Sequence, residues 1–309
     1  MNYRVLGRTG LSVSAVSLGT VSLGLDYGIA APGDFGRPGD AEAIGLLTEA
    51  IDRGVTLFDT APAYGESERL IGRAIGRDPR AIIATKVQVP PGPPRAIRDA
   101  INASLDASRR AISRDMLDIV QLHNATRETV ADGWAIDALE GARRGGSVRF
   151  IGASVYGEDA ALAAIDSGRF DVLQIAFNAL DQRMAARVLP SADDAGVGIV
   201  VRSAFLKGAL TSKAQWLPEP LAQLRHAAER ARDVLAGGSW ERLPTAAFRF
   251  CLSAPGVASV LAGARTMAEL DAALVAEAAG ALDTSTLSMA DNLALTDEQL
   301  LNPSYWPLP

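Results

Sequence analysis

The sequence predicts an α/β protein in which eight parallel strands and their helices close into a (β/α)8 TIM barrel. Short apolar runs alternate with longer segments of helical period, as is typical of repeated βα units. The chain has 309 residues, a length that one large barrel can occupy. The first predicted strand is followed by GTVSLGLDYG, which fits neither phosphate-binding turn expected of an open, doubly wound sheet. We therefore expect one barrel domain over residues 1–309.

Eight apolar runs are the predicted barrel strands, and segments of helical period separate them. Residues 94–112 and 66–76 carry apolar side chains every three or four positions, the spacing of one buried helical face. Residues 3–14 form two short runs around a Gly-rich turn, which indicates a hairpin able to close the bottom of the barrel. The predicted strands cover residues 16–20, 55–59, 81–86, 116–122, 149–154, 171–176, 197–202 and 257–262.

Three segments are longer than ordinary loops: residues 21–39, 203–243 and 283–309. The first two follow strand ends at the C-terminal face, where barrel active sites are built. An extra helix is predicted within the second, opening at WLPEPLAQL. Candidate substrate contacts in the first are Tyr27 and Phe35, whereas the tail pair Tyr305-Trp306 is expected to seal the barrel wall.

Composition and charge exclude several classes of function. The formal net charge of −6 and the lack of a Lys/Arg run argue against nucleic acid. The N-terminus lacks the pattern of a signal peptide, and no apolar run is long enough to span a membrane, so we expect a soluble, cytoplasmic protein. The only cysteine, Cys251, has apolar neighbours and is interpreted as a buried thiol. His226 lies among helix charges and is expected to be solvated.

Four polar residues follow three consecutive predicted strands. Asp59 ends the second strand, Lys86 the third and His123 the fourth, while Tyr64 lies in the loop after Asp59. Each has an ordinary alternative when taken alone: a turn cap, a surface lysine, a core histidine or a packed loop aromatic. Because neighbouring strand ends meet at one rim of a barrel, we expect all four in a single pocket.

Together these residues suit proton transfer to and from a carbonyl oxygen. A tyrosine has a pKa near 10, and an adjacent Lys86 ammonium would lower the pKa of Tyr64. Asp59 would keep the buried lysine charged, and His123 would hydrogen-bond the same carbonyl oxygen that Tyr64 protonates. The sequence therefore predicts a general acid/base that serves the reduction of C=O or its reverse.

Six segments resemble the aldo-keto reductase superfamily in order and spacing, over about residues 3 to 280: LGRTGLSVSAVSLGT, FDTAPAYGESERLIGRAIG, IATKV, MLDIVQLH, VRFIGAS and LQIAFNALD. The resemblance implies the (β/α)8 fold and an NAD(P)-dependent oxidoreductase that interconverts a carbonyl and an alcohol by hydride transfer, without a metal. It also implies a small-molecule carbonyl or sugar substrate and a catalytic tetrad of Asp59, Tyr64, Lys86 and His123.

Cofactor contacts are also implied by the resemblance. Ser154 and Gln174 would hold the nicotinamide carboxamide, with Asn178 as a weaker candidate. The family's YSPL segment, which stacks on the nicotinamide, reads RSAF here, so Arg202 stands at the stacking position, followed by Ser203. A guanidinium can stack on a ring and brings positive charge near the pyrophosphate or the substrate. Alternatively, Arg202 is an ion-pair partner within the barrel mouth.

The predicted adenosine segment, LAGARTMAELDAALVA, also departs from the family. Gly263 precedes Arg265, and Glu269 and Ala273 stand where the family commonly has Gln or Arg and Asn. Arg265 favours the 2'-phosphate of NADP, whereas Glu269 opposes it. The balance favours NADP, with NAD as the alternative.

Three other functions stay open from the sequence. One is a sugar 1-dehydrogenase that works with NAD in the oxidative direction. Another is an aldolase-type enzyme in which Lys86 is a Schiff-base nucleophile. The third is a dinucleotide-binding regulatory subunit without turnover. The loops define the pocket's shape but leave the substrate, the direction of the reaction and the oligomeric state undetermined.

Overall fold

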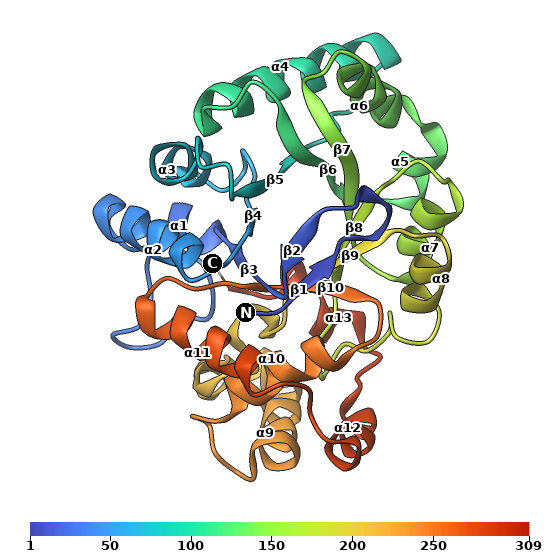
Figure 1. Cartoon of the computed structure of the whole chain (residues 1–309). Coiled ribbons are helices and arrows are strands. Elements are labelled where there is room, and N and C mark those ends of the chain that lie inside the picture. Colours follow the sequence, from blue (N-terminus) through green and yellow to red (C-terminus); the bar gives the residue numbers. More distant parts are fainter. Residues whose placement is uncertain (309) are drawn as a thin grey trace.

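The computed structural model describes residues 1–308 and contains a closed barrel of eight parallel strands (Figure 1). Neighbouring strands follow the order β10-β3-β4-β5-β6-β7-β8-β9. The predicted (β/α)8 fold is therefore confirmed. The strands are β3 (Val16–Gly19), β4 (Leu57–Asp59), β5 (Ile82–Val87), β6 (Leu117–Ala125), β7 (Val148–Val155), β8 (Val172–Ala176), β9 (Gly198–Arg202) and β10 (Val257–Ala262).

The helices surround the strands in Figure 1, and their buried apolar residues belong to one core cluster with apolar residues of the strands. In α4 the buried residues are the five that the sequence periodicity selects, among them Ile101 and Leu105. The helices are α1 (Val21–Gly24), α2 (Asp40–Asp52), α3 (Ser67–Ala74), α4 (Pro94–Ile112), α5 (Arg127–Asp132), α6 (Trp134–Arg144), α7 (Glu158–Asp166), α8 (Val188–Asp194), α9 (Ala222–Ala236), α10 (Leu243–Ser253), α11 (Met267–Ala278), α12 (Thr284–Ala290) and α13 (Glu298–Leu301).

The element boundaries differ from those predicted by a few residues. The strand expected at 55–59 begins at Leu57, and β6 continues three residues beyond the expected 122, through His123. The extra helix predicted in segment 203–243 is α9. In the tail, Trp306 is 5% exposed and packs into the core whereas Tyr305 is 52% exposed, so only the tryptophan seals the wall. Residue 309, the last of this tail, lies outside the described residues.

The N-terminal hairpin, β1 (Tyr3–Val5) and β2 (Ser12–Ser14), lies across the middle of the ring of helices in Figure 1. Its loop inserts Leu6 among inward-facing strand residues such as Leu57 and Val200, as expected of a hairpin that closes the barrel. Gly7 has a positive φ of 48° and packs so closely on the backbone of Gly198 that a Cβ there would clash. The hairpin therefore seals one end of the barrel with apolar contacts.

Side-chain alternation divides the barrel interior into two layers. The lower layer is the apolar set that packs near the hairpin, which includes Leu57, Ala84, Ile119, Val172 and Val200. Side chains two positions apart on a strand point the same way. The residues two positions further along these five strands are polar, and we call them the upper layer: Asp59, Lys86, Gln121, Gln174 and Arg202. The site's polar groups thus stand above a dry floor.

No helix among residues 1–308 combines the length and the apolar character needed to cross a membrane.

Replacing Leu6 by alanine should lower the free energy of unfolding by about 2–5 kcal/mol, because a fully buried leucine leaves a cavity at the barrel floor. Chemical denaturation would measure the loss. Val5→Ala is the matched control, since Val5 is 66% exposed, and it should change stability by less than about 0.5 kcal/mol. Equal effects of the two substitutions would contradict the assignment of Leu6 to the floor.

Candidate active site

The four residues predicted at the strand ends lie together in the structure. Asp59 ends β4, Lys86 lies in β5 and His123 in β6, while Tyr64 comes from the loop between β4 and α3. The Lys86 Nζ lies 2.7 and 2.6 Å from the two carboxylate oxygens of Asp59. It lies 4.8 Å from the centroid of the Tyr64 ring, which meets the His123 ring edge-on at 5.8 Å.

Lys86 and Asp59 form a buried ion pair. Lys86 is 0% exposed and Asp59 is 3% exposed, which excludes the alternative of a surface lysine. Nζ also donates to the carbonyl oxygen of Thr60 at 3.0 Å. Burial alone would lower the pKa of Lys86, but the charge of Asp59 and the contact with Tyr64 outweigh it and raise this pKa. Lys86 is therefore an ammonium ion.

Asp59 accepts hydrogen bonds from two amides as well as from Lys86. Gln174 Nε2 donates to Oδ1 at 2.6 Å, and Gln121 Nε2 donates to the same oxygen at 3.2 Å. Gln121, 1% exposed, was not among the residues predicted from the sequence. Its place two residues before His123 on β6, facing the same side, is the signal that could have identified it.

The protonation states of Tyr64 and His123 follow from burial. Burial raises the pKa of Tyr64, and the Lys86 charge opposes this effect without cancelling it. The expectation of a lowered phenol pKa is therefore wrong in net direction, although Lys86 acts with the predicted sign. Burial, together with the Lys86 charge, lowers the pKa of His123 to about 4. At neutral pH both side chains are uncharged.

The loop that carries Tyr64 is fixed by its backbone. Tyr64 N donates to the carbonyl oxygen of Ala61 at 3.0 Å, and Ser67 N donates to the carbonyl oxygen of Tyr64 at 3.1 Å. Gly24 of α1 packs on that same carbonyl so closely that a Cβ would overlap it. This close approach requires glycine at position 24 and places the phenol beside Lys86.

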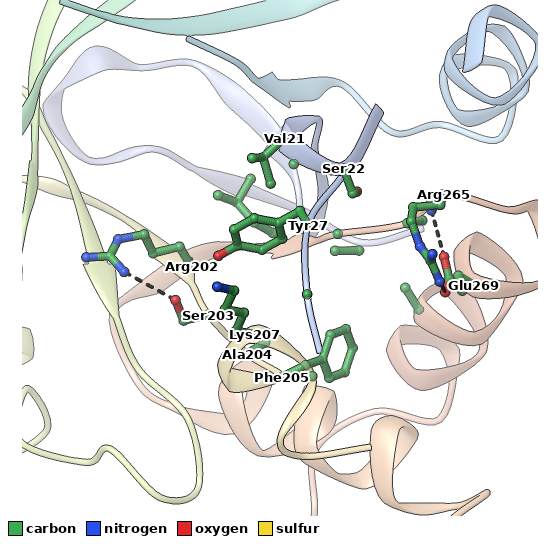
Figure 2. A pocket seen from close by; sticks show the side chains of 18 of the residues that line it. Val21, Ser22, Tyr27, Arg202, Ser203, Ala204, Phe205, Lys207, Arg265 and Glu269 are labelled. Carbon is green, nitrogen blue, oxygen red and sulfur yellow. Dashed lines mark hydrogen bonds and ion pairs between the residues drawn. The ribbon is translucent and has the colours of Figure 1, made fainter. Parts of the chain in front are cut away.

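A cavity of about 460 Å³ extends from the tetrad across the barrel mouth. Asp59, Tyr64 and His123 line one part of it, and Arg265 and Glu269 line another. Figure 2 shows Tyr27 with Arg202 and Ser203 to one side and the Arg265–Glu269 pair to the other. The candidate substrate contact Tyr27 thus lies in the cavity, whereas Phe35 is not among the lining residues.

Two of the predicted carboxamide contacts face each other beside Asp59. Ser154 Oγ lies 3.4 Å from Gln174 Oε1, on adjacent strands β7 and β8. Because the amide nitrogen of Gln174 donates to Asp59, the amide oxygen of Gln174 is oriented toward Ser154. Asn178 is fully buried, and its side chain bonds to backbone groups at Ser203, Leu180 and Asp181.

Arg202 packs on an aromatic residue of the protein itself. Its guanidinium carbon lies 3.8 Å from the centroid of the Tyr156 ring. Nη2 donates to the carbonyl oxygen of Val155 at 3.0 Å, and Nη1 donates to Ser203 Oγ at 3.2 Å. Within residues 1–308 no carboxylate pairs with Arg202, so the ion-pair interpretation is wrong.

The predicted adenosine end is occupied by an ion-pair cluster. Arg265 Nη2 lies 3.1 Å from Glu269 Oε1 and also pairs with Asp34. Lys213 Nζ lies 3.1 Å from the second carboxylate oxygen of Asp34. The cluster therefore joins the loops after β3, β9 and β10. Neither Asp34 nor Lys213 was predicted, because nothing local in the sequence indicates a partner more than 170 residues away.

Two further titratable residues, Cys251 and His226, are not among the residues that line the cavity. Cys251 is 0% exposed, and burial raises the pKa of its thiol, as expected of a core cysteine. His226 is exposed on α9, as expected. The part of the chain that the structure describes has no group of three or more His, Cys, Asp or Glu side chains arranged to hold a metal ion.

Comparison with known proteins adds the family. Residues 15–294 match the model of the "Aldo/keto reductase family". This chain belongs to that family. The relatives that match this chain are oxidoreductases and dehydrogenases, so the chain is an oxidoreductase of the carbonyl–alcohol type. Aldo-keto reductases use NAD(P)H.

Individual relatives of this aldo-keto reductase agree with the match. It is 31% identical to the "Uncharacterized oxidoreductase YrpG" of Bacillus subtilis over 69% of each chain. It is 29% identical to a "D-threo-aldose 1-dehydrogenase" of a Pseudomonas species, over 83% of this chain and 90% of the relative. The holo form of "aldo-keto reductase AKR11C1 from Bacillus halodurans" superposes with a TM-score of 0.80 at 26% identity, covering 98% of this chain and 100% of that one.

Gln121→Met should destabilise the protein by about 1–3 kcal/mol, because the substitution keeps the volume but removes a donor from the buried Asp59 carboxylate. Denaturant titration measures this. The exposed Gln215 supplies the control, and Gln215→Met should lie within about 0.5 kcal/mol of the wild type. An undiminished unfolding free energy in the Gln121 variant would show that Asp59 does not depend on this donor.

Proposed function

We propose that the chain is an NAD(P)-dependent aldo-keto reductase that interconverts an aldehyde, ketone or sugar carbonyl with its alcohol. The observation that carries the proposal is the contact of Tyr64 with the buried Lys86–Asp59 pair, beside a neutral His123, on the wall of the cavity. This arrangement places a proton donor, Tyr64, and a hydrogen-bond donor, His123, side by side on the cavity wall. A second candidate is sugar 1-dehydrogenation with NAD. The name of the Pseudomonas relative supports this reaction but names no cofactor.

Tyr64 is the general acid/base of the proposed reaction. Its raised pKa keeps the phenol protonated at neutral pH, which suits donation of a proton to a carbonyl oxygen. The Lys86 ammonium stabilises the phenolate that remains after this transfer. The neutral imidazole of His123 donates a hydrogen bond to the same oxygen and orients the carbonyl. In the reverse direction Tyr64 takes the proton back from the alcohol.

The cavity offers groups on both sides of Tyr27 that would hold a dinucleotide cofactor. Ser154 Oγ and Gln174 Oε1 would bind the carboxamide, and Ser203, Gly263, Arg265 and Glu269 line the path toward the adenosine. The bound cofactor would supply or accept the hydride at the carbonyl carbon. We propose NADP(H), with Arg265 facing the 2'-phosphate. NAD(H) is the alternative, because Asp34 and Glu269 already neutralise Arg265.

The aldolase alternative conflicts with the state of Lys86. A Schiff-base nucleophile must be a neutral amine with access to the substrate. Lys86 is 0% exposed, and both Asp59 oxygens hold it as an ammonium ion. Borohydride reduction in the presence of a carbonyl substrate tests this point, because a covalent adduct on Lys86 would overturn the reductase mechanism.

Tyr64→Phe should lower the rate of carbonyl reduction by about 10²–10⁴-fold, because it removes the proton donor and little else. Steady-state reduction of a panel of aldehydes and sugars measures the rate, and a fluorescence titration with NADPH and NADH should find cofactor binding preserved. If Tyr64→Phe abolishes turnover but still supports the protein's function in the cell, the regulatory-subunit alternative is favoured. An active variant would remove Tyr64 from the mechanism.

Alcohol oxidation by the wild type should rise by about tenfold per pH unit between pH 7 and 9. The phenolate form of Tyr64 is the base in this direction, and a pKa raised above 10.0 leaves little phenolate at neutral pH. Reduction needs the protonated phenol and should stay level over the same range. Initial rates at saturating cofactor measure both. A plateau in oxidation from pH 7 upward would contradict a raised pKa.

Glu269→Gln should tighten NADPH binding by about tenfold, because it removes a carboxylate that competes with the 2'-phosphate for Arg265. NADH carries no such phosphate, so its dissociation constant should change by less than about threefold. Fluorescence titration gives both dissociation constants, with Glu241→Gln at an exposed position as the control. Equal changes for the two dinucleotides would place the 2'-phosphate elsewhere.

A further inference from the structure

We infer that Arg202 binds a carboxylate on the substrate, so that the preferred substrates are carbonyl compounds that also carry a carboxylate group. The inference rests on the proposed function and names the substrate class for the same site. It follows from the partners of the charged groups around the cavity, from the geometry of Arg202 and from its closeness to Tyr64.

The carboxylates that line the cavity already have cationic partners. Asp59 pairs with Lys86, Glu269 pairs with Arg265, and Asp34 pairs with both Arg265 and Lys213. Arg202 lines the same cavity, yet no carboxylate of residues 1–308 pairs with it. A partly buried guanidinium without a counter-ion is costly, and an anionic ligand would compensate its charge.

The guanidinium of Arg202 is fixed by contacts that leave several of its N–H donors without an acceptor among the bonds described. One face stacks on Tyr156, and single bonds to Val155 O and Ser203 Oγ fix its plane. Arginine has five N–H donors in a rigid fork, and these two bonds use two of them. The rest can make the paired, parallel hydrogen bonds that a carboxylate accepts. Arg202 is thus preorganised for a planar anion.

Its position is on the substrate side of the cavity. Arg202 ends β9 and lines the cavity together with Tyr64, His123 and Tyr27. Its charge also acts on the pKa of Tyr64, which burial raises and which Lys86 and Arg202 both lower. In Figure 2 the hydroxyl of Tyr27 points toward the Arg202 side chain, away from the Arg265–Glu269 pair.

Electrostatics favours carboxylate binding by Arg202 over stacking of Arg202 on the nicotinamide. The oxidised nicotinamide ring is positively charged, and a fixed guanidinium against it would disfavour that form. A substrate carboxylate bound to Arg202 cancels the unfavourable charge. The same pairing orients the substrate, because two points are then held: the carboxylate at Arg202 and the carbonyl oxygen between Tyr64 and His123.

The test compares aldehydes that differ only in charge. The probes are 3- and 4-formylbenzoate with their neutral isosteres, 3- and 4-formylbenzamide, because two ring positions sample two separations between the carbonyl and the anion. We expect the wild type to show at least about tenfold higher kcat/KM for one benzoate than for its amide, mainly through KM. Arg202→Leu should abolish this preference, and Arg202→Lys should retain part of it.

Arg232→Leu is the matched control, because Arg232 also stacks on an aromatic ring, that of Trp240, but does not line the cavity. It should keep the wild-type preference. Equal loss for benzoate and amide in Arg202→Leu, together with a weaker cofactor dissociation constant, would make Arg202 a cofactor contact and overturn the inference. A wild-type ratio near one for both pairs would overturn it as well.

Failure of the proposed function is distinguishable from failure of this inference. If the wild type turns over none of the four probes or a wider carbonyl panel, the proposed reaction fails. Calorimetric titration of the same benzoates and benzamides into the protein with NADPH then decides the role of Arg202 alone. Selective benzoate binding that Arg202→Leu abolishes supports the carboxylate site, and equal or absent binding of both classes refutes it.

Discussion

The buried ion pair of Lys86 and Asp59 is the constraint on which the rest of the site depends. Taking two charges out of water is expensive, and their attraction repays the cost only when the remaining donors and acceptors are also satisfied. Here Asp59 accepts from Lys86, Gln121 and Gln174, and Lys86 also donates to Thr60. The polar upper layer of the barrel is therefore a requirement of this pair as much as a lining for substrate.

The apolar floor makes that polar layer effective. Leu6 and the lower-layer residues close the barrel beneath the ion pair, and water cannot reach the pair from that side. Charges interact more strongly in such a low-dielectric surrounding than in water. Tyr64 is buried separately, in the loop that packs on Gly24, and this burial raises the pKa of its phenol more than Lys86 lowers it. The floor thus affects the strength of the ion pair, whereas the loop after β4 determines the protonation state of Tyr64.

The sequence could predict the features that depend on local periodicity and on the order of strands. Apolar runs located all eight strands, and strand ends located Asp59, Lys86 and His123, because parallel strands bring their C-terminal ends to one rim. The direction of the pKa shift of Tyr64 could not be predicted from the sequence, since it depends on how deeply the ring is buried. The stacking of Arg202 on Tyr156 was missed for a similar reason, because it depends on how side chains at the ends of β7 and β9 pack across the intervening β8.

The ion pairs of Asp34 join the loop that carries Tyr27 to the loops after β9 and β10. Asp34 lies in the loop after β3, which also carries Tyr27, and it bonds to Lys213 after β9 and Arg265 after β10. The Asp34 side chain is 52% exposed, but its partners are more buried, with Arg265 10% and Lys213 16% exposed. The solvent screening that weakens fully exposed ion pairs is therefore reduced here. Because one loop holds both Asp34 and Tyr27, these ion pairs also help to hold the wall that Tyr27 forms in the cavity beside Arg202.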